Sequence, residues 1–121
     1  QSFKIRIIGN HIETTSSNAI YVGPLSVSFP GSGAGESLVN SNITSVSAVT
    51  GIRFDNAPRS IATGNQVEAP GGFSIGFFSG SDNSIATGNR CGLDMDATGS
   101  SGCVITTSSP VVNPTLNIIA P

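Results

Sequence analysis

The sequence predicts an all-β chain in which short repeats stack on one another as a parallel β-helix. The first observation is a hexapeptide, Ser-Ile-Ala-Thr-Gly-Asn, which occurs at 60–65 and again at 84–89, 24 residues further on. The second is a pair of fainter copies, which end at Asn42 and at Asn10. The third is a set of apolar residues at fixed offsets from these asparagines. An internal repeat of this length is typical of solenoid architectures.

The apolar offsets have the two-residue period of β-strands. Three positions before the four asparagines lie Ile7, Val39, Ala62 and Ala86, and two positions after them lie Ile12, Thr44, Val67 and Cys91. Ten and twelve positions after the first three asparagines come the pairs Ile20 and Val22, Ile52 and Phe54, and Ile75 and Phe77. Alternate residues of a strand face the same side. Two-helix repeats need roughly 33 residues or more, and leucine-rich repeats need more leucine, so a parallel β-helix is the remaining prediction.

The recurring asparagines predict a ladder along the stack. Asn10, Asn42, Asn65 and Asn89 are separated by 32, 23 and 24 residues, and the long interval holds a Gly-, Ser- and Pro-rich stretch at 30–35 that indicates an inserted loop. Strands spaced about 4.8 Å apart would place these asparagines above one another, so that their amides hydrogen-bond along the axis. A preference for Gly-Asn turns is the alternative. The apolar offsets that recur with the asparagines favour the ladder.

Composition limits the size of the fold and its partners. With 121 residues the chain is expected to form one domain of about four to five coils. A net charge of −2 without a basic cluster argues against a nucleic-acid partner. No apolar run has the length that spans a bilayer, so no membrane insertion is expected. Because the chain starts at Gln1 without an initiating Met, we expect it to be a piece of something longer.

The repeat is interrupted toward the C-terminus. The fourth repeat is expected to contain about six extra residues within 92–102, so that its second strand would be 103–107. Beyond Ile105 the repeat is not expected to resume, since Pro110 and Pro114 would stop ladder pairing. The prediction is a β-helix over 1–109 and a capping or subunit-contact strand within 110–121. Cys91 and Cys103 are expected to be free thiols, with a disulfide as the alternative, and no metal or cofactor is expected.

Two pairs of carboxylates are candidates for chemistry. Glu13 and Glu68 each lie three residues after an asparagine, which places them at one angular position, two coils and about 9.5 Å apart. The acid and base of inverting glycosidases lie about 6.5–9.5 Å apart, so the pair is a candidate catalytic site. The intervening Ser45 favours a chance alignment. Asp94 and Asp96 could converge on a cation or a sugar, whereas a solvated loop is the simpler interpretation.

Outward-facing polar and aromatic side chains are candidates for binding. Tyr21 and Arg53 occupy equivalent positions one coil apart, and Arg90 shares an outward stripe with His11 and Gln66. Aromatic rings and guanidinium groups hold sugar rings by stacking and hydrogen bonding. The competing interpretation is an ordinary solvated face.

The repeats resemble those of a known family. The two Ser-Ile-Ala-Thr-Gly-Asn copies, with Gly-x-x-Ile-x-Phe at 72–77 and a looser version at 51–54, are similar to the right-handed parallel β-helices of the pectin-lyase-like group. The resemblance covers roughly residues 3–109. Within the group, Ser-, Gly- and Asn-rich repeats that end in a Pro-interrupted strand are most similar to bacteriophage tailspikes and tail fibres. This resemblance implies a homotrimer in the virion tail that binds host-surface polysaccharide, and it assigns no catalytic residue.

Two functions are therefore expected. In the first, the chain is the distal β-helical part of a phage tail fibre or tailspike, and Phe29, Phe73, Phe78 and the strand at 116–120 would form subunit contacts. In the second, it is a fragment of an extracellular polysaccharide-degrading enzyme, such as a lyase, glycosidase or epimerase. The short stack, with one His and seven acidic residues, favours the first.

Overall fold

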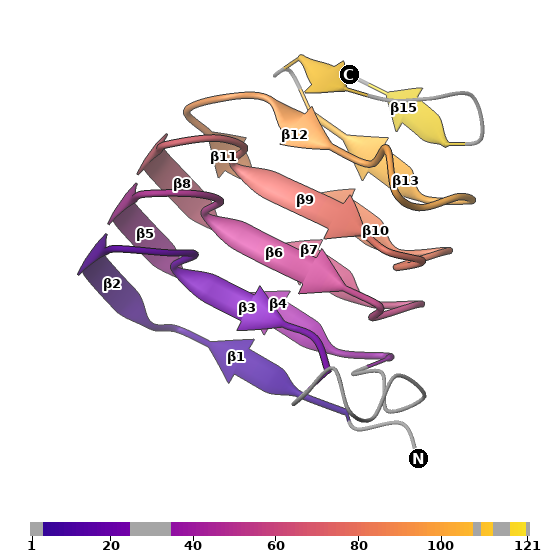
Figure 1. Cartoon of the computed structure of the whole chain (residues 1–121), viewed down its shortest axis with the longest axis horizontal. Coiled ribbons are helices and arrows are strands. Elements are labelled where there is room, and N and C mark those ends of the chain that lie inside the picture. The colour runs from indigo at the N-terminus through magenta and orange to yellow at the C-terminus, as the bar shows by residue number, and fades with distance from the viewer. Residues whose placement is uncertain (1–3, 25–34, 108–109, 113–116, 121) are drawn as a thin grey trace.

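Repeats that stack in register organise the whole fold. A computed structural model of the chain describes residues 4–24, 35–107, 110–112 and 117–120, so Phe29, the stretch at 30–34 and Pro114 lie outside the described residues. All strand pairs in this part of the chain are parallel, they form three sheets, and none of the described residues is helical. Figure 1 shows the resulting stack of similar layers, with the N-terminus at the bottom and the C-terminus at the top. This all-β arrangement is compatible with a parallel β-helix, as the sequence predicts.

Successive repeats contribute strands to the three sheets in turn. Sheet A contains β1 (Arg6–Ile8), β4 (Leu38–Asn40), β7 (Ile61–Thr63), β10 (Ile85–Thr87), β13 (Val104–Thr106) and β15 (Ile118–Ala120). Sheet B contains β2 (His11–Thr15), β5 (Ile43–Ser47), β8 (Gln66–Pro70) and β11 (Arg90–Cys91). Sheet C contains β3 (Ile20–Val22), β6 (Ile52–Asp55), β9 (Ile75–Phe78), β12 (Met95–Asp96) and β14 (Val111–Val112). Because the connections return each repeat to the same sheet, equivalent residues lie side by side.

The register does not depend on the length of the connections. In sheet A, Ile7 lies beside Val39 and Val39 lies beside Ala62. The first pair is separated by 32 residues of chain and the second by 23. The extra residues of the first interval therefore leave the pairing of the strands on either side unchanged.

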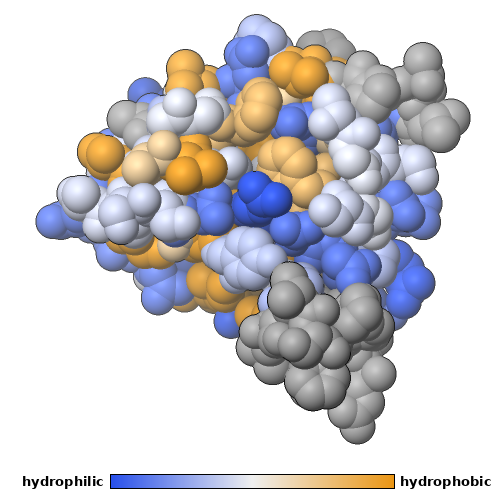
Figure 2. All heavy atoms as spheres, viewed as in Figure 1, coloured by the Kyte–Doolittle hydropathy of each residue, from blue (hydrophilic) through white to orange (hydrophobic). Residues whose placement is uncertain are grey.

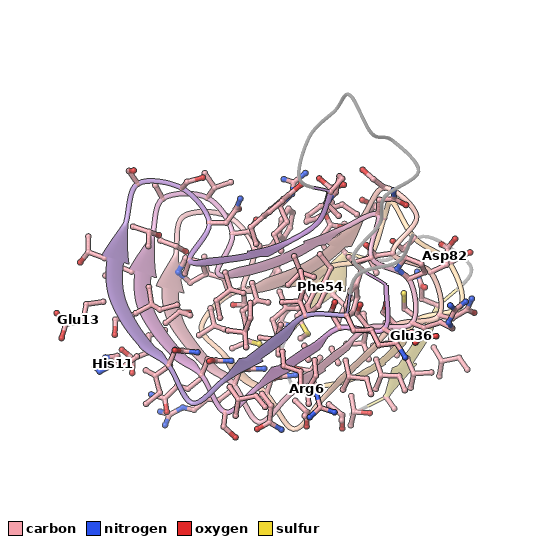
Figure 3. The ribbon with its side chains drawn as sticks, turned by 90° about the horizontal axis from the view of Figure 1, so that it is seen from below. Arg6, His11, Glu13, Glu36, Phe54 and Asp82 are labelled. Atoms are coloured by element: carbon pink, nitrogen blue, oxygen red, sulfur yellow. The ribbon has the colours of Figure 1, made fainter. Side chains whose placement is uncertain are left out.

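The apolar core is built mainly from three inward-facing columns, two along sheet C and one along sheet A. Phe54 points into the interior, whereas Arg6, His11 and Glu13 point outward (Figure 3). Members of one column touch directly, since the Phe54 and Phe77 rings lie 5.1 Å apart between centroids. The buried columns comprise Ile20, Ile52, Ile75 and Met95; Val22, Phe54, Phe77 and Ala97; and Val39, Ala62, Ala86 and Ile105. Burial of this apolar surface is the main favourable term in the folding of such a narrow stack.

The four asparagines form a continuous chain of hydrogen bonds at the turn between sheets A and B. The side-chain amides of Asn10, Asn42 and Asn65 donate to the Oδ1 atoms of Asn42, Asn65 and Asn89 over 3.0, 3.0 and 2.9 Å. Each of these Oδ1 atoms also accepts the backbone N–H of the preceding asparagine. The remaining amide hydrogen of Asn65 bonds the carbonyl of Val39. The buried Asn42 and Asn65 amides are thus fully satisfied, which is what burial of a polar group requires.

A serine ladder, which the sequence analysis missed, runs along the other end of the sheet A strands. The hydroxyl oxygens of Ser37, Ser60 and Ser84 accept the backbone N–H of Ile5, Ser37 and Ser60, each over 3.1 Å. All three serines are buried. The first and last residues of Ser-Ile-Ala-Thr-Gly-Asn therefore fasten the two ends of one short strand.

Glycine allows the sharp turn into the asparagine ladder. Gly9, Gly64 and Gly88, each just before a ladder asparagine, have φ angles of 69°, 64° and 64°. Only glycine adopts this left-handed region without steric cost. Ser41 takes the same conformation in the second repeat, with φ 55°. The recurring Gly-Asn pair is thus explained by the turn and by the ladder together.

The C-terminal part differs from the sequence expectation. The prediction that 103–107 supplies the second strand of the fourth repeat is wrong, because β12 already lies beside β9 in sheet C and β13 pairs with β10 in sheet A. Pairing also resumes after Ile105, since β14 joins β12 and β15 joins β13, both in parallel. Pro110 does not prevent this, because it comes just before β14 and uses its carbonyl to accept the N–H of Met95.

The connection that carries the sheet B strand shortens toward the C-terminus. Eleven residues follow β1, β4 and β7 (9–19, 41–51 and 64–74), seven follow β10 (88–94) and four follow β13 (107–110). As a result β11 has two residues, whereas the earlier strands of sheet B have five. Within the described residues, sheet B stops at β11 while sheets A and C continue.

Substitution of an internal ladder asparagine is expected to destabilise the stack more than substitution at its exposed end. Asn65→Ala removes the partners of Asn42, Asn89 and the Val39 carbonyl, so we expect a loss of about 3 kcal/mol in the free energy of unfolding, from the cost of buried unsatisfied groups. Asn10 is exposed, so Asn10→Ala is expected to cost about 1 kcal/mol or less. Urea denaturation measures both, and equal losses would contradict the role of the ladder.

Candidate functional site

The outer face of sheet C carries a cluster of aromatic and charged side chains. Tyr21 lies beside Arg53, and Arg53 lies beside Gly76, on adjacent strands. Two residues further along β6 and β9, Asp55 lies beside Phe78 on the same face. We call Tyr21, Arg53, Asp55 and Phe78 the sheet C cluster. Figure 2 shows this side of the molecule, where hydrophobic and hydrophilic side chains lie next to one another.

Arg53 is held in place by two other members of the cluster. Its Nη2 lies 3.1 Å from Oδ2 of Asp55, and its Cζ lies 4.5 Å from the centroid of the Phe78 ring. The Phe78 ring also contacts that of Phe73, 6.4 Å away between centroids. A guanidinium that both pairs with a carboxylate and stacks on a ring keeps few alternative rotamers. Its remaining N–H groups are thereby held in fixed directions.

Two glycines let the rings lie flat on the sheet. A Cβ atom added to Gly76 would lie 2.1 Å from Cε2 of Phe78, and one added to Gly23 would lie 2.5 Å from the hydroxyl oxygen of Tyr21. Both distances are far shorter than a van der Waals contact allows. The rings of Tyr21 and Phe78 therefore occupy space that only glycine leaves free.

Tyr21 combines an exposed ring with a fixed hydroxyl. The side chain is 46% exposed, yet burial of part of it raises the pKa of Tyr21, and the nearby Asp55 carboxylate raises it further, while Arg53 opposes the rise. The phenol also forms a hydrogen bond with Asp55, in which the O–H donates. The arrangement keeps the phenol protonated and leaves a large part of its surface accessible.

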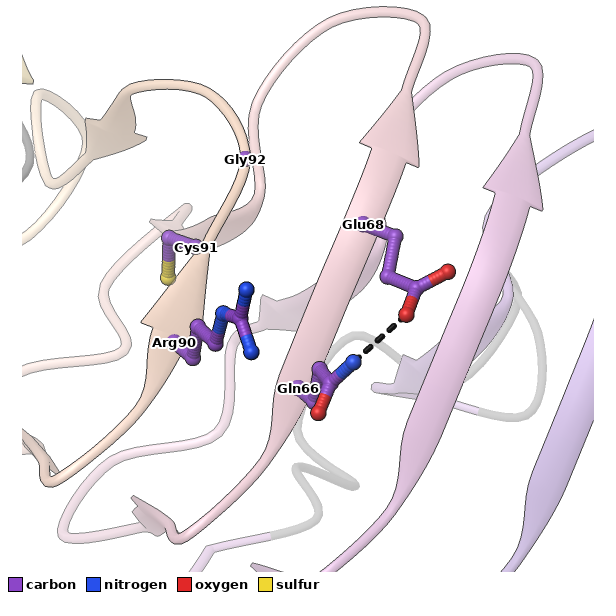
Figure 4. Close-up of a pocket in the computed structure, with 5 residues that line it drawn as sticks. All are labelled: Gln66, Glu68, Arg90, Cys91 and Gly92. Carbon is purple, nitrogen blue, oxygen red and sulfur yellow. Dashed lines mark hydrogen bonds between the residues drawn. The ribbon is translucent and has the colours of Figure 1, made fainter.

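A second candidate lies where sheet B ends. Gln66, Glu68, Arg90, Cys91 and Gly92 line a hollow of about 300 Å³ (Figure 4). Arg90 lies beside Gln66 in the register, and the Gln66 amide donates a hydrogen bond to Oε1 of Glu68. The sequence analysis placed Arg90 and Glu68 in different candidate sites, and the structure brings them to one.

Glu13 and Glu68 occupy the same outward column of sheet B, with Ser45 on the strand between them. Both are exposed, and Glu68 is bonded to Gln66. Two strand spacings would place the backbones of these residues about 9.5 Å apart.

The expectation of a solvated loop for the Asp-x-Asp pair is wrong for Asp96. Asp96 is 5% exposed, lies on β12 beside Gly76, and accepts the N–H of Thr98 over 2.8 Å. The carbonyl of the half-buried Asp94 accepts the N–H of Ser74. Within the described residues, no three His, Cys, Asp or Glu side chains form a group that could hold a metal ion.

One of the two outward rows of sheet A is apolar along most of its length, whereas the other contains Asn40, Thr63 and Thr87. Ile61 and Ile85, each 38% exposed, are neighbours in one outward row, and Ile118 at its C-terminal end is 64% exposed. We call this row the sheet A stripe; it consists of Leu38, Ile61, Ile85, Val104 and Ile118. Phe73 and Phe78, two of the expected contact residues, are half-buried, and their rings contact one another at β9 and the residues before it.

The sequence analysis did not identify Asp55, Phe78 and the two glycines beneath the rings as part of the sheet C cluster. The signal was available, because Asp55 and Phe78 follow the outward positions 53 and 76 by two residues, which is one strand period. The hollow had no comparable signal, since it depends on where sheet B ends.

Comparison with protein-family models, curated proteins and solved structures gives no match for this chain. No helix in the described part of the chain has the length and apolar character needed to cross a membrane. The candidate sites are therefore interpreted from their own residues.

The thiol of Cys91 is expected to react slowly below pH 10. Burial raises its pKa to about 11, although a hydrogen bond with Ser74 partly opposes this. In a Cys103→Ser variant, which leaves one thiol, alkylation by iodoacetamide should accelerate about tenfold per pH unit from pH 7.5 to 10, because the thiolate is the reactive form. The same variant in guanidinium chloride is the control and should level off near pH 9. A plateau near pH 9 in the folded protein would contradict the shifted pKa.

Proposed function

We propose that this chain is the distal β-helical part of a bacteriophage tail fibre or tailspike, right-handed and trimeric, that binds host-surface polysaccharide. The observation that carries the proposal is the sheet C cluster. Its rings lie flat and its charged groups are fixed, on an open sheet rather than in an enclosed cavity. A long polymer can lie along such a face, whereas a small metabolite needs a concave site.

The groups of the sheet C cluster match those of a sugar. The exposed ring of Tyr21 offers an apolar face to the C–H side of a pyranose. The Asp55 carboxylate accepts hydrogen bonds from hydroxyl groups, and the free N–H groups of Arg53 donate to them. Because Arg53 is already held by Asp55 and Phe78, little side-chain entropy is lost on binding.

The trimer is supported by the sheet A stripe. Five adjacent aliphatic side chains in one outward row form an apolar surface of the kind that subunit contacts cover. A straight row on a flat sheet suits side-by-side association of parallel stacks. The proposed contact thus lies on sheet A rather than at Phe73 and Phe78.

An enzymatic function is less well supported. Glu13 and Glu68 lie in one outward column, two strands apart, but both carboxylates are exposed and Ser45 stands between them. Release of oligosaccharides from a bound polysaccharide would favour the enzyme, and binding without release favours the adsorption protein.

Removal of the Tyr21 ring or the Arg53 guanidinium is expected to weaken polysaccharide binding. On a panel of purified bacterial surface polysaccharides, the wild-type protein should bind at least one. Tyr21→Ala and Arg53→Ala should each reduce that affinity about tenfold, or about 1.4 kcal/mol, through loss of stacking or of charged hydrogen bonds. Biolayer interferometry measures the affinity. Arg6→Ala, which removes a guanidinium from the outer face of sheet A, is the matched control, and an equal loss in it would contradict a specific site.

The sheet A stripe is expected to control the oligomeric state. The wild-type protein should elute as a trimer, and Ile85→Lys should shift it to monomer, because a buried unpaired charge at a contact is costly. Size-exclusion chromatography with light scattering measures the mass. Val49→Lys replaces an exposed apolar residue away from the stripe and should remain trimeric. A monomeric wild-type protein would overturn the proposed assembly.

A further inference from the structure

The hollow at the end of sheet B exists because the repeat shortens there. After β11 the chain leaves the sheet at Gly92, in the position where the preceding strand carries Glu68. A Cβ atom added to Gly92 would lie 1.9 Å from the carbonyl oxygen of Glu68, so the backbone passes directly against β8 at this point. The residue beside Glu68 therefore has no side chain that covers the carboxylate.

The walls of the hollow carry one strong acceptor and one strong donor. Glu68 has about four lone-pair sites on its two carboxylate oxygens, of which the Gln66 amide uses one. Arg90 extends from β11 toward β8 (Figure 4). Among the described residues, its guanidinium has no hydrogen bond or ion pair. Gln66 lies between the Arg90 guanidinium and the Glu68 carboxylate (Figure 4), so donor and acceptor capacity remain open on either side of Gln66.

The size of the hollow suits a single sugar unit. At about 300 Å³ it lies at the lower end of the range for ligand pockets, about 300–1,000 Å³. A chain of sugars would not fit, whereas a terminal or branching unit would. This differs from the open face of sheet C.

We infer that the hollow is a subsite for one neutral pyranose unit, held through neighbouring hydroxyl groups. Glu68 accepts two of its O–H groups, and Arg90 donates to the oxygen atoms on the other side. The charges of Glu68 and Arg90 offset one another, so the hollow has no net charge that attracts an anionic ligand, and a uronic acid would also be repelled by Glu68; a neutral sugar is therefore favoured. This inference rests on the proposed polysaccharide-binding function, since it adds a branch or end-group site to the polymer site on sheet C.

The test uses simple sugars as probes. Titration of the wild-type protein with the methyl glycosides of glucose, galactose and mannose, followed by ¹H–¹⁵N NMR, should shift the backbone signals of Arg90 and Gly92 and the side-chain signals of Gln66 for at least one sugar. Glu68→Gln and Arg90→Ala should each weaken that binding at least tenfold. Glu13→Gln removes the equivalent carboxylate two strands away and should leave the affinity unchanged.

The outcomes separate this inference from the proposed function. If none of the methyl glycosides shifts these signals, or if glucuronic acid binds there more tightly, the neutral-sugar subsite is wrong, even if polysaccharide still binds at the sheet C cluster. If no polysaccharide binds the wild-type protein, the proposed function fails, whatever happens in the hollow. Loss of binding in Glu13→Gln equal to that in Glu68→Gln would also overturn the subsite.

Discussion

The hydrogen-bonded ladder of asparagine amides is the constraint on which the rest of the structure depends. The amides join successive layers, and the Oδ1 atoms of Asn42, Asn65 and Asn89 each accept both a side-chain and a backbone N–H. A shift of one residue would leave these buried groups without partners, so the ladder fixes the register. Fixed register aligns the apolar columns inside the stack and also aligns the outward columns. The core and the candidate sites therefore have the same physical origin.

Much of the stack could be predicted because its periodicity is visible in the chain. The offsets from Asn42 and Asn65 identified which residues face inward, and Val39, Ala62, Ile52 and Phe54 do so. The serine ladder escaped notice, because a serine at a strand end has several common roles and no single one is marked by spacing. The strand β12 was missed because seven residues, rather than eleven, separate it from β10, so the expected offset no longer applied.

The two candidate sites differ in how far a sequence can reveal them. The pairing of Tyr21 with Arg53 followed directly from equal offsets. The rings can lie against the sheet because Gly23 and Gly76 have no side chain. This steric effect is not marked by the sequence repeat. The hollow depends on a strand that ends early, so that Arg90 and Glu68 line one hollow beside β11, where sheet B ends within the described residues. The site arises where the repeat is interrupted, and a search for sequence periodicity does not detect a site of this kind.

The unchanged register across the long first interval has a consequence for how this protein can vary. Since Ile7 and Val39 are register partners just as Val39 and Ala62 are, the alignment of the layers does not depend on the length of the connection between them. Loop closure costs grow only slowly with length, so added residues at this point are tolerated thermodynamically. Evolution or protein design can thus change the length of the connection between sheets C and A while the strands on either side keep their register.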